Sequence, residues 1–159
     1  MRSCLEREPG FVDAEQYRLF HGIAYTWRVE IDALVEELQL LLEYGFDPNV
    51  RDAETGKTPL MLFASTDRPN HQTEDALLRL FPVLLDGGAE IYAQHLKHGA
   101  TALAHAAGCG ATDIVDRLLE RGADPYLPVD RPHGQPSAWA EREGHLQLVR
   151  RLAVDMPRE

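Results

Sequence analysis

The amino-acid sequence predicts an all-α protein, a solenoid of about four stacked helix pairs joined by hairpin-like turns. Three observations support this fold class. Glycine follows amphipathic helical patterns at Gly45, Gly88 and Gly122, where it would end a helix as a C-terminal cap. A similar turn sequence surrounds Leu60 and Leu103. The apolar residues before each glycine fall at matching offsets, so residue type and spacing recur together.

Residues 99–125 form the most regular unit and serve as the reference for the others. Small residues at 104–107 favour a narrow helix that can pack closely against its neighbours, and Gly108 and Gly110 break it. Asp113 lies where an acidic side chain favours the start of the next helix. That second helix carries an apolar stripe at helical spacing, made of Ile114, Val115, Leu118 and Leu119.

The same stripe can be followed through the other units by aligning the helix-ending glycines. Its positions hold Leu80, Phe81, Leu84 and Leu85 in the preceding unit, Glu37, Leu38, Leu41 and Leu42 in the first, and Leu148, Val149, Leu152 and Ala153 in the last. Glu37 and Ala153 are the exceptions. Both belong to end units, where a stack of repeats meets water and needs a polar outer face.

These units divide a single domain in order. Residues 1–11 are charged and contain a proline and a glycine that break helices, so we expect a loose N-terminal lead. Asp13 can cap a first helix that ends near Tyr25, and a second helix is expected over 29–44. The predicted units are an N-terminal capping unit at 12–50, a long repeat at 51–93, a regular repeat at 94–127 and a C-terminal capping unit at 128–155.

The long repeat carries residues that the regular repeat lacks. Because the helix before Gly88 stays in phase, the insertion falls at 66–75, and its polar composition predicts a loop. Pro82 lies inside the following helix, where it predicts either a kinked long helix or a break that leaves 73–81 as a separate segment. We expect the inserted loop to help recognise a partner, through Asp67, Arg68, Asn70 and His71.

Together these features resemble the ankyrin-repeat family over roughly 29–154. The residues that carry the resemblance are Thr58-Pro59-Leu60, Ala106-Ala107 with Gly110, the stripe of Ile114, Val115, Leu118 and Leu119, Gly88-Ala89-Glu90, Gly122-Ala123-Asp124 and Gly144-His145. The histidine that usually follows the family's Thr-Pro-Leu motif is replaced by Met61, Ala104 and Ala138, so we expect part of the usual hydrogen bonding between repeats to be lost. The resemblance implies a non-catalytic module that binds proteins along one concave side.

The family's contact positions can be transferred to this chain by register. At the turn tips they are Glu54, Thr55, Lys57, Lys97, His98 and Arg131, and on the inner faces Ser65, Thr66, Cys109, Arg142 and Glu143. Gly108 and Cys109 are expected to leave a shallow spot that a partner side chain could fill. Tyr92 and Tyr126 occupy equivalent positions in successive units, and they either pack between units or act as exposed binding anchors.

Charge restricts the kind of partner. The chain has 16 Lys and Arg against 26 Asp and Glu, a net charge of −10. Repulsion from phosphates argues against nucleic acid and against an anionic membrane surface, so we expect a basic protein partner. No apolar run is long enough to cross a membrane, and the first residues do not resemble a secretory signal. These features predict a cytoplasmic protein with Cys4 and Cys109 reduced.

A metal-binding protein or enzyme is the alternative from another functional class. His95, His98, His105 and Cys109 are metal-ligating residue types that lie close in sequence. His95 and His98, however, fall in a predicted turn, where we expect them to be solvated, and no pair of closely spaced cysteines accompanies them. We therefore expect no cofactor, no bound metal and no enzymatic activity.

The sequence thus predicts a monomer that binds one protein partner and masks or inhibits it. A narrower hypothesis is an immunity or antitoxin-type protein that blocks a toxic enzyme. A purely structural role within a larger assembly is a third hypothesis.

Overall fold

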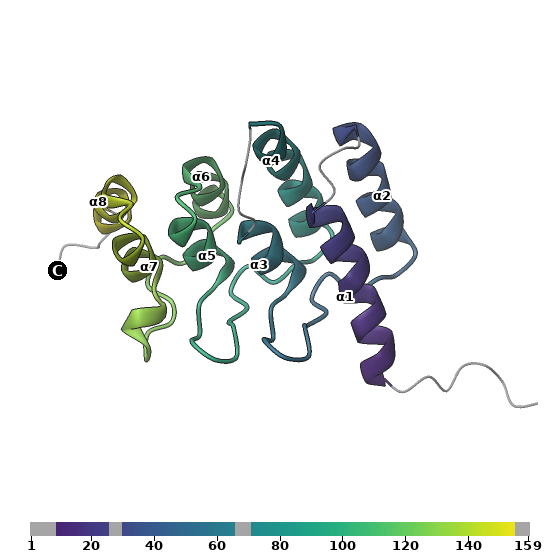
Figure 1. Ribbon diagram of the computed structural model, residues 1–159, viewed down its shortest axis with the longest axis horizontal. Helices are drawn as coiled ribbons and strands as arrows, with labels where there is room; N and C mark the ends of the chain where they lie inside the picture. The colour runs from purple at the N-terminus through teal and green to yellow at the C-terminus, as the bar shows by residue number, and fades with distance from the viewer. Residues whose placement is uncertain (1–8, 26–29, 66–70, 155–159) are drawn as a thin grey trace, which may run out of the picture.

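The protein forms two layers of helices, which a computed structural model describes over residues 9–25, 30–65 and 71–154. The inner layer contains α1 (Pro9–Tyr25), α3 (Pro59–Ala64), α5 (Ala102–Gly108) and α7 (Pro136–Arg142). The outer layer contains α2 (Ile31–Glu43), α4 (His71–Asp86), α6 (Thr112–Glu120) and α8 (Leu146–Val154). Figure 1 shows the four pairs side by side, with the connecting turns projecting beyond the inner layer. The described residues contain no strand, so the predicted all-α solenoid is confirmed.

Three outer helices end at the glycines that the sequence analysis singled out. Gly45, Gly88 and Gly122 have φ values of 83°, 97° and 87°, a left-handed conformation that glycine adopts without strain. The residue after each glycine then donates its N–H back to the last turn of the helix, as Ala89 does to the Leu84 carbonyl at 3.1 Å. These bonds satisfy carbonyls that the helix leaves free and direct the chain into the next turn.

The apolar stripes of the outer helices form the core together with the inner layer. Ile114, Val115 and Leu118 are fully buried, and the equivalent leucines of α4 and α8 are buried in the same way. The predicted exceptions, Glu37 and Ala153, are exposed on the two end units. Burying a large aliphatic side chain contributes about 1.5–3 kcal/mol, so this repeated stripe is the main source of cohesion between layers.

Small side chains bring the inner helices close together. All residues of α5 from Ala102 to Ala107 are buried, and this helix packs against both α3 and α7. Thr58 is the N-cap residue of α3, and its Oγ1 accepts a hydrogen bond from the Met61 N–H at 3.4 Å. The prediction of a narrow, closely packed helix at 104–107 is therefore confirmed.

The structure differs from the sequence prediction at the N-terminus and in the inserted segment. Helix α1 begins at Pro9, so residues 9–11 are helical rather than part of a loose lead, and Asp13 lies within the helix instead of capping it. Proline is tolerated in the first turn of a helix, where its missing N–H has no intrahelical partner.

Helix α4 begins at His71, so residues 71–75 are helical, and the prediction of a loop over the whole of 66–75 was wrong for them. Only the alternative with a helical segment over 73–81 places 73–75 in a helix. Helix α4 also continues through Pro82 without a break, which decides between the two alternatives for that residue.

The last turn also departs from the expected hairpin. Residues 132–134 form a short 3-10 helix, η1 (Pro132–Gly134). A Cβ atom on Gly134 would lie only 2.4 Å from the His98 carbonyl oxygen, so this turn approaches the preceding one more closely than a side chain allows. Gln135 closes the turn, because its Nε2 donates to the Tyr126 carbonyl at 2.9 Å.

Candidate protein-binding groove

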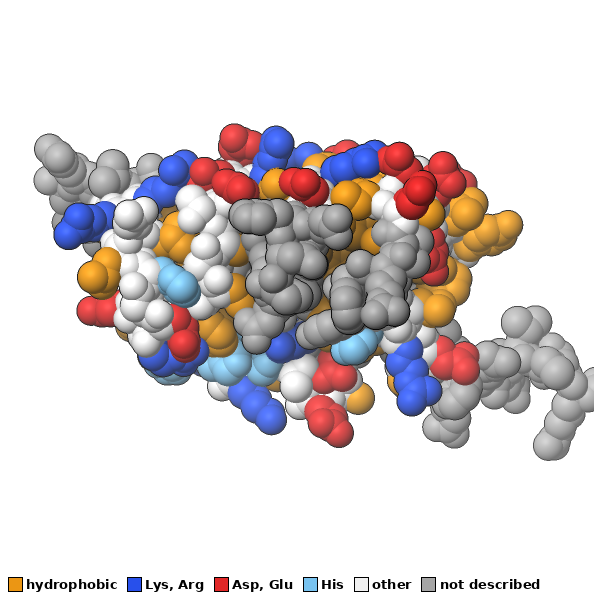
Figure 2. All heavy atoms as spheres, turned by 45° about the horizontal axis from the view of Figure 1, so that its top comes forward, with side chains coloured by type: hydrophobic (Ala, Val, Ile, Leu, Met, Phe, Trp, Pro, Cys, Tyr) orange, Lys and Arg blue, Asp and Glu red, His pale blue; other side chains and the backbone are white. Residues whose placement is uncertain are grey.

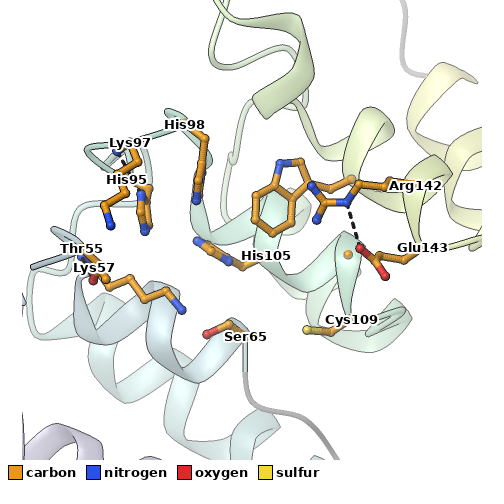
Figure 3. A pocket seen from close by; sticks show the side chains of 12 residues that line it. Thr55, Lys57, Ser65, His95, Lys97, His98, His105, Cys109, Arg142 and Glu143 are labelled. Atoms are coloured by element: carbon orange, nitrogen blue, oxygen red, sulfur yellow. Dashed lines mark hydrogen bonds and ion pairs between the residues drawn. The ribbon is translucent and has the colours of Figure 1, made fainter.

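A groove of about 560 Å³ runs along the inner layer between the turn tips and helices α3, α5 and α7 (Figure 3). Three successive units contribute to its walls, so its shape depends on the stacking of the repeats. The residues that line it are Thr55, Lys57, Ser65, His95, Lys97, His98, His105, Gly108, Cys109, Trp139, Arg142 and Glu143.

The groove brings together many of the residues that sequence register placed on the contact surface. These are Thr55, Lys57, Ser65, Lys97, His98, Cys109, Arg142 and Glu143. Glu54 and Arg131 are exposed at turn tips but do not line it, and Arg131 lies 3.8 Å from the Asp130 carboxylate. Thr66, Asp67, Arg68 and Asn70 fall outside the described residues, and His71 is described only as the first residue of α4.

The two tyrosines also lie outside the groove. Tyr92 is 55% exposed, yet its hydroxyl donates to the Gly122 carbonyl of the next unit at 2.8 Å. Asn49, at the equivalent position one unit earlier, donates to the Gly88 carbonyl at 2.9 Å. Tyr92 therefore joins successive units and remains accessible. Tyr126 is half-buried, and its N–H donates to Asp124 Oδ1 at 2.8 Å.

Three histidines and a tryptophan form the floor of the groove, and we call this group the ring cluster. The rings of His95 and His98 stack with centroids 3.8 Å apart and an interplanar angle of 16°. His105 lies 5.9 Å from the first of these rings and 6.0 Å from the second. Trp139 lies 4.9 Å from His105 and 5.0 Å from His98, so it closes the cluster from the next unit.

The expectation that His95 is solvated was wrong. His95 and His105 are each only 4% exposed. The reason is that the turn folds tightly, with the His95 N–H donating to the Ala100 carbonyl at 2.9 Å and the Gly99 N–H donating back to the His95 carbonyl at 2.8 Å. This closure places the imidazole against α5 rather than in water, which a local sequence pattern does not reveal.

Burial keeps these histidines uncharged. Burial, assisted by the positive charge of Lys57, lowers the pKa of His105 to about 3. Burial lowers the pKa of His95 to about 4, assisted by repulsion between the protonated forms of the stacked His95 and His98 rings and by the charge of Lys57, and burial also lowers the pKa of His98. The Lys97 N–H donates to His95 Nδ1 at 3.2 Å, which assigns the proton of the neutral ring to Nε2. At neutral pH the ring cluster is therefore polar and uncharged.

His105 carries an unused hydrogen-bonding atom. Its Nε2 is buried, and within the part of the chain that the structure describes it has no hydrogen-bond partner. The Nδ1 atom of His98 is in the same state. A buried polar atom without a partner costs about 1–3 kcal/mol, and a ligand that supplies the missing bond recovers part of that cost.

Trp139 is the groove residue that sequence reasoning missed. Repeat register could have identified it. Leu62, His105 and Trp139 occupy the same position in successive units, two residues after Leu60, Leu103 and Ser137. A Cβ atom on Gly108 would lie 2.9 Å from Trp139 Cε3. The shallow spot predicted at Gly108 is therefore filled by the indole ring of the next unit, while Cys109 is exposed beside it.

The metal hypothesis finds no geometric support in the described residues. No group of three or more His, Cys, Asp or Glu side chains within 9–25, 30–65 and 71–154 is arranged to hold a metal ion. Two of the three imidazoles are stacked face to face, so their nitrogens do not converge on one point. Figure 3 shows Cys109 set apart from the three histidines. Cys4, which the sequence analysis expects to be reduced together with Cys109, lies outside the described residues.

These features define a helical-repeat protein whose concave side is shaped by successive units. Residues 29–128, more than half of the chain, match the family described as ankyrin repeats in three copies. The chain belongs to the ankyrin-repeat family, whose repeats generally mediate protein–protein interaction and are typically non-catalytic.

Three relatives illustrate the range of proteins that contain similar repeats. The chain is 39% identical over 92 residues to human SH3 and multiple ankyrin repeat domains protein 2, covering 58% of this chain and 4% of that protein. It is 32% identical over 130 residues to the mouse B-cell lymphoma 3 protein homolog, covering 79% of this chain and 27% of the relative. It is 32% identical over 118 residues to the neurogenic locus notch homolog protein 1 of Xenopus tropicalis, covering 69% of this chain and 5% of that protein.

The similarity to these proteins is therefore confined to a small part of each. The chain spans between 4% and 27% of their lengths. Within the described ranges, every helix is too short or too polar to cross a membrane.

Proposed function

We propose that this chain binds one protein partner through the groove and its turn tips, without catalysis of its own, and masks the surface that it covers. The observation that carries the proposal is the groove itself, in which Arg142 and half-buried Lys57 flank a neutral floor made of the ring cluster, with Trp139 at one end. Tryptophan and arginine are enriched among residues that dominate binding energy at protein interfaces.

The rigidity of the groove also supports this proposal. Its walls are built on α3, α5 and α7, whose backbones are held by buried alanines and leucines. A surface that is already formed loses little conformational entropy when a partner binds. A contact face built from three units also meets a partner at several points, which favours one partner of matching shape.

Site-specific crosslinking tests the proposal, because the chain has two cysteines and one of them lines the groove. In a Cys4→Ser variant, a photoactivatable group on Cys109 is expected to crosslink one protein in the native host. The matched control carries Cys4→Ser and Cys109→Ser, with Glu36→Cys on the exposed face of α2.

The outcomes are distinct. A single crosslinked protein from Cys109 that is absent with the α2 label supports binding in the groove, and a fall in that protein's activity when it is mixed with this chain supports masking. Equal crosslinking from both positions, or none from Cys109, contradicts the proposal.

A further inference from the structure

The groove carries a charge opposite in sign to that of the whole chain. Among its lining residues, Lys57, Lys97 and Arg142 are cationic and Glu143 carries a carboxylate, whereas the net charge of the chain is −10. In Figure 2, histidine side chains gather toward the lower part of the face with Lys and Arg beside them. Most exposed carboxylates of the described helices lie on the outer layer, among them Asp32, Glu36, Glu37 and Glu43 on α2 and Asp113 and Glu120 on α6, while Glu54 at a turn tip and Glu141 on α7 are exposed near the groove without lining it.

The carboxylate of the groove is already neutralised. Arg142 Nε donates to Glu143 Oε1 at 2.9 Å, and the Arg142 guanidinium carbon lies 4.6 Å from the centre of the Trp139 ring. Within the described residues, neither Lys57 nor Lys97 has a carboxylate at ion-pair distance. Two ammonium groups therefore face the groove without a direct ion pair in these parts of the chain, and the nearby Asp52 carboxylate balances part of the Lys57 charge.

The titration of the ring cluster agrees with a positive potential in the groove. The charge of Lys57 contributes to lowering the pKa of His95, His98 and His105, and that of Arg142 contributes at His98. The neutral rings do not add charge at neutral pH. They provide polar atoms, including the buried and unpartnered Nε2 of His105, which could bond to a group entering between the cations.

We propose that the groove receives an acidic segment of the protein partner, with carboxylates at Lys57 and Arg142 and an apolar side chain against Trp139. Figure 3 shows Lys57 and Arg142 on opposite sides of His105. Carboxylates form strong charge-assisted hydrogen bonds with both cations, and the indole offers apolar surface between them.

This proposal rests on the proposed function and replaces the basic partner expected from net charge. The total of −10 is a property of the whole chain, but a short segment in the groove responds mainly to charges within about 8–10 Å. The same total still disfavours nucleic acid, because a polyanion extends beyond the groove and meets the acidic outer surface.

A displayed library of random short peptides tests the proposal without knowledge of the natural partner. Selection on the unmodified chain is expected to enrich Asp and Glu, and an enriched peptide should bind more weakly as salt is added. Lys57→Glu and Arg142→Glu should each weaken that peptide by about tenfold or more, and selection on the double variant should enrich Lys and Arg.

Arg150→Glu, an equal change of charge on the exposed surface of α8, is the matched control and should leave affinity within about twofold. Lys57→Gln provides a milder variant, and circular dichroism verifies that each variant is folded. Enrichment of peptides without acidic residues overturns the acidic-segment proposal but leaves the proposed function intact. Groove-dependent binding of random-sequence RNA, lost in the same variants, also overturns it. Failure to select any peptide counts against the acidic-segment proposal and against the proposed function. The Cys109 crosslink then shows whether the proposed function itself fails.

Discussion

His105 shows how one residue of the repeat can be given a new role by its neighbours. Its position in the unit is held by Leu62 one repeat earlier and by Trp139 one repeat later. The surrounding alanines and the Trp139 ring bury it to 4% exposure, and Lys57 adds positive charge nearby. Both effects disfavour the protonated ring, so the folded protein holds a neutral histidine where the unfolded chain would bind a proton.

Because His105 is neutral in the folded state, we expect the protein to lose stability in acid. The pKa of His105 is about 3 in the folded state, against 6.5 for a histidine in an unfolded chain. Below pH 6.5 the unfolded state binds more protons, so the free energy of unfolding should fall as pH drops toward about 3 and should be fully retained above 6.5. A histidine that is neutral in the folded state and protonated in the unfolded state changes the free energy of unfolding by up to about 1.4 kcal/mol per pH unit.

Urea unfolding of His105→Leu across this range measures the effect. The variant carries the residue found at the Leu62 position, and its stability should depend less steeply on pH than that of the unmodified chain. His133→Asn, a change at an exposed histidine, should retain the original slope. Parallel curves for His105→Leu and the unmodified chain would contradict a buried neutral histidine.

At the scale of the secondary-structure element, α4 is the helix that differs most from its counterparts. It extends from His71 to Asp86, whereas the regular repeat has α6 from Thr112 to Glu120. The additional turns come from residues whose composition is typical of a loop. Helix α4 packs on α2 and α6, and this packing outweighs the local preference of Pro82 to interrupt it.

We therefore expect Pro82→Ala to raise the melting temperature. Proline has no N–H for the carbonyl of Leu78 and its ring crowds that carbonyl, a combined cost of about 3 kcal/mol in a helix interior. Because Pro82 is half-buried, loss of its ring contacts offsets part of the gain. Pro136→Ala is the matched control, since proline at the start of α7 costs nothing and should not be improved by alanine. A lower melting temperature for Pro82→Ala would show that its packing outweighs the missing hydrogen bond.

At the scale of the whole molecule, the stack is linear and each unit contacts its immediate neighbours. Ion pairs join successive outer helices, from Asp32 to Arg79 at 2.5 Å and from Asp116 to Arg151 at 2.8 Å. Such exposed pairs contribute about 0.2–1 kcal/mol each and mainly support alignment. The buried stripes provide most of the cohesion, and the end units have one covered side instead of two.

This arrangement predicts graded local stability. Amide hydrogen exchange followed by mass spectrometry should find the slowest exchange in α5, which packs on α3, α6 and α7, and faster exchange in α8 at the end of the stack. The physical reason is that opening a central unit breaks two interfaces, whereas opening an end unit breaks one. Uniform protection across all helices would instead indicate that the stack opens as a single cooperative unit.

The sequence by itself determined the class of fold, the register of the repeats and the positions at which helices end. These follow from local rules, because an amphipathic stripe and a glycine after it act over a few residues. Register also identified eight of the residues that line the groove, including Lys57 and Arg142. It did not establish that α4 begins as early as His71, because the polar composition of 66–75 is typical of a loop.

Only the tertiary structure decided what the groove contains. The closure of one turn buried His95, and the indole of Trp139 crossed from the next unit to fill the space beside Gly108. The tertiary structure also brings Lys57, Lys97 and Arg142 together, so the groove is cationic although the chain as a whole is acidic. Burial and local potential depend on residues distant in sequence that become neighbours in space, and composition contains no record of that arrangement.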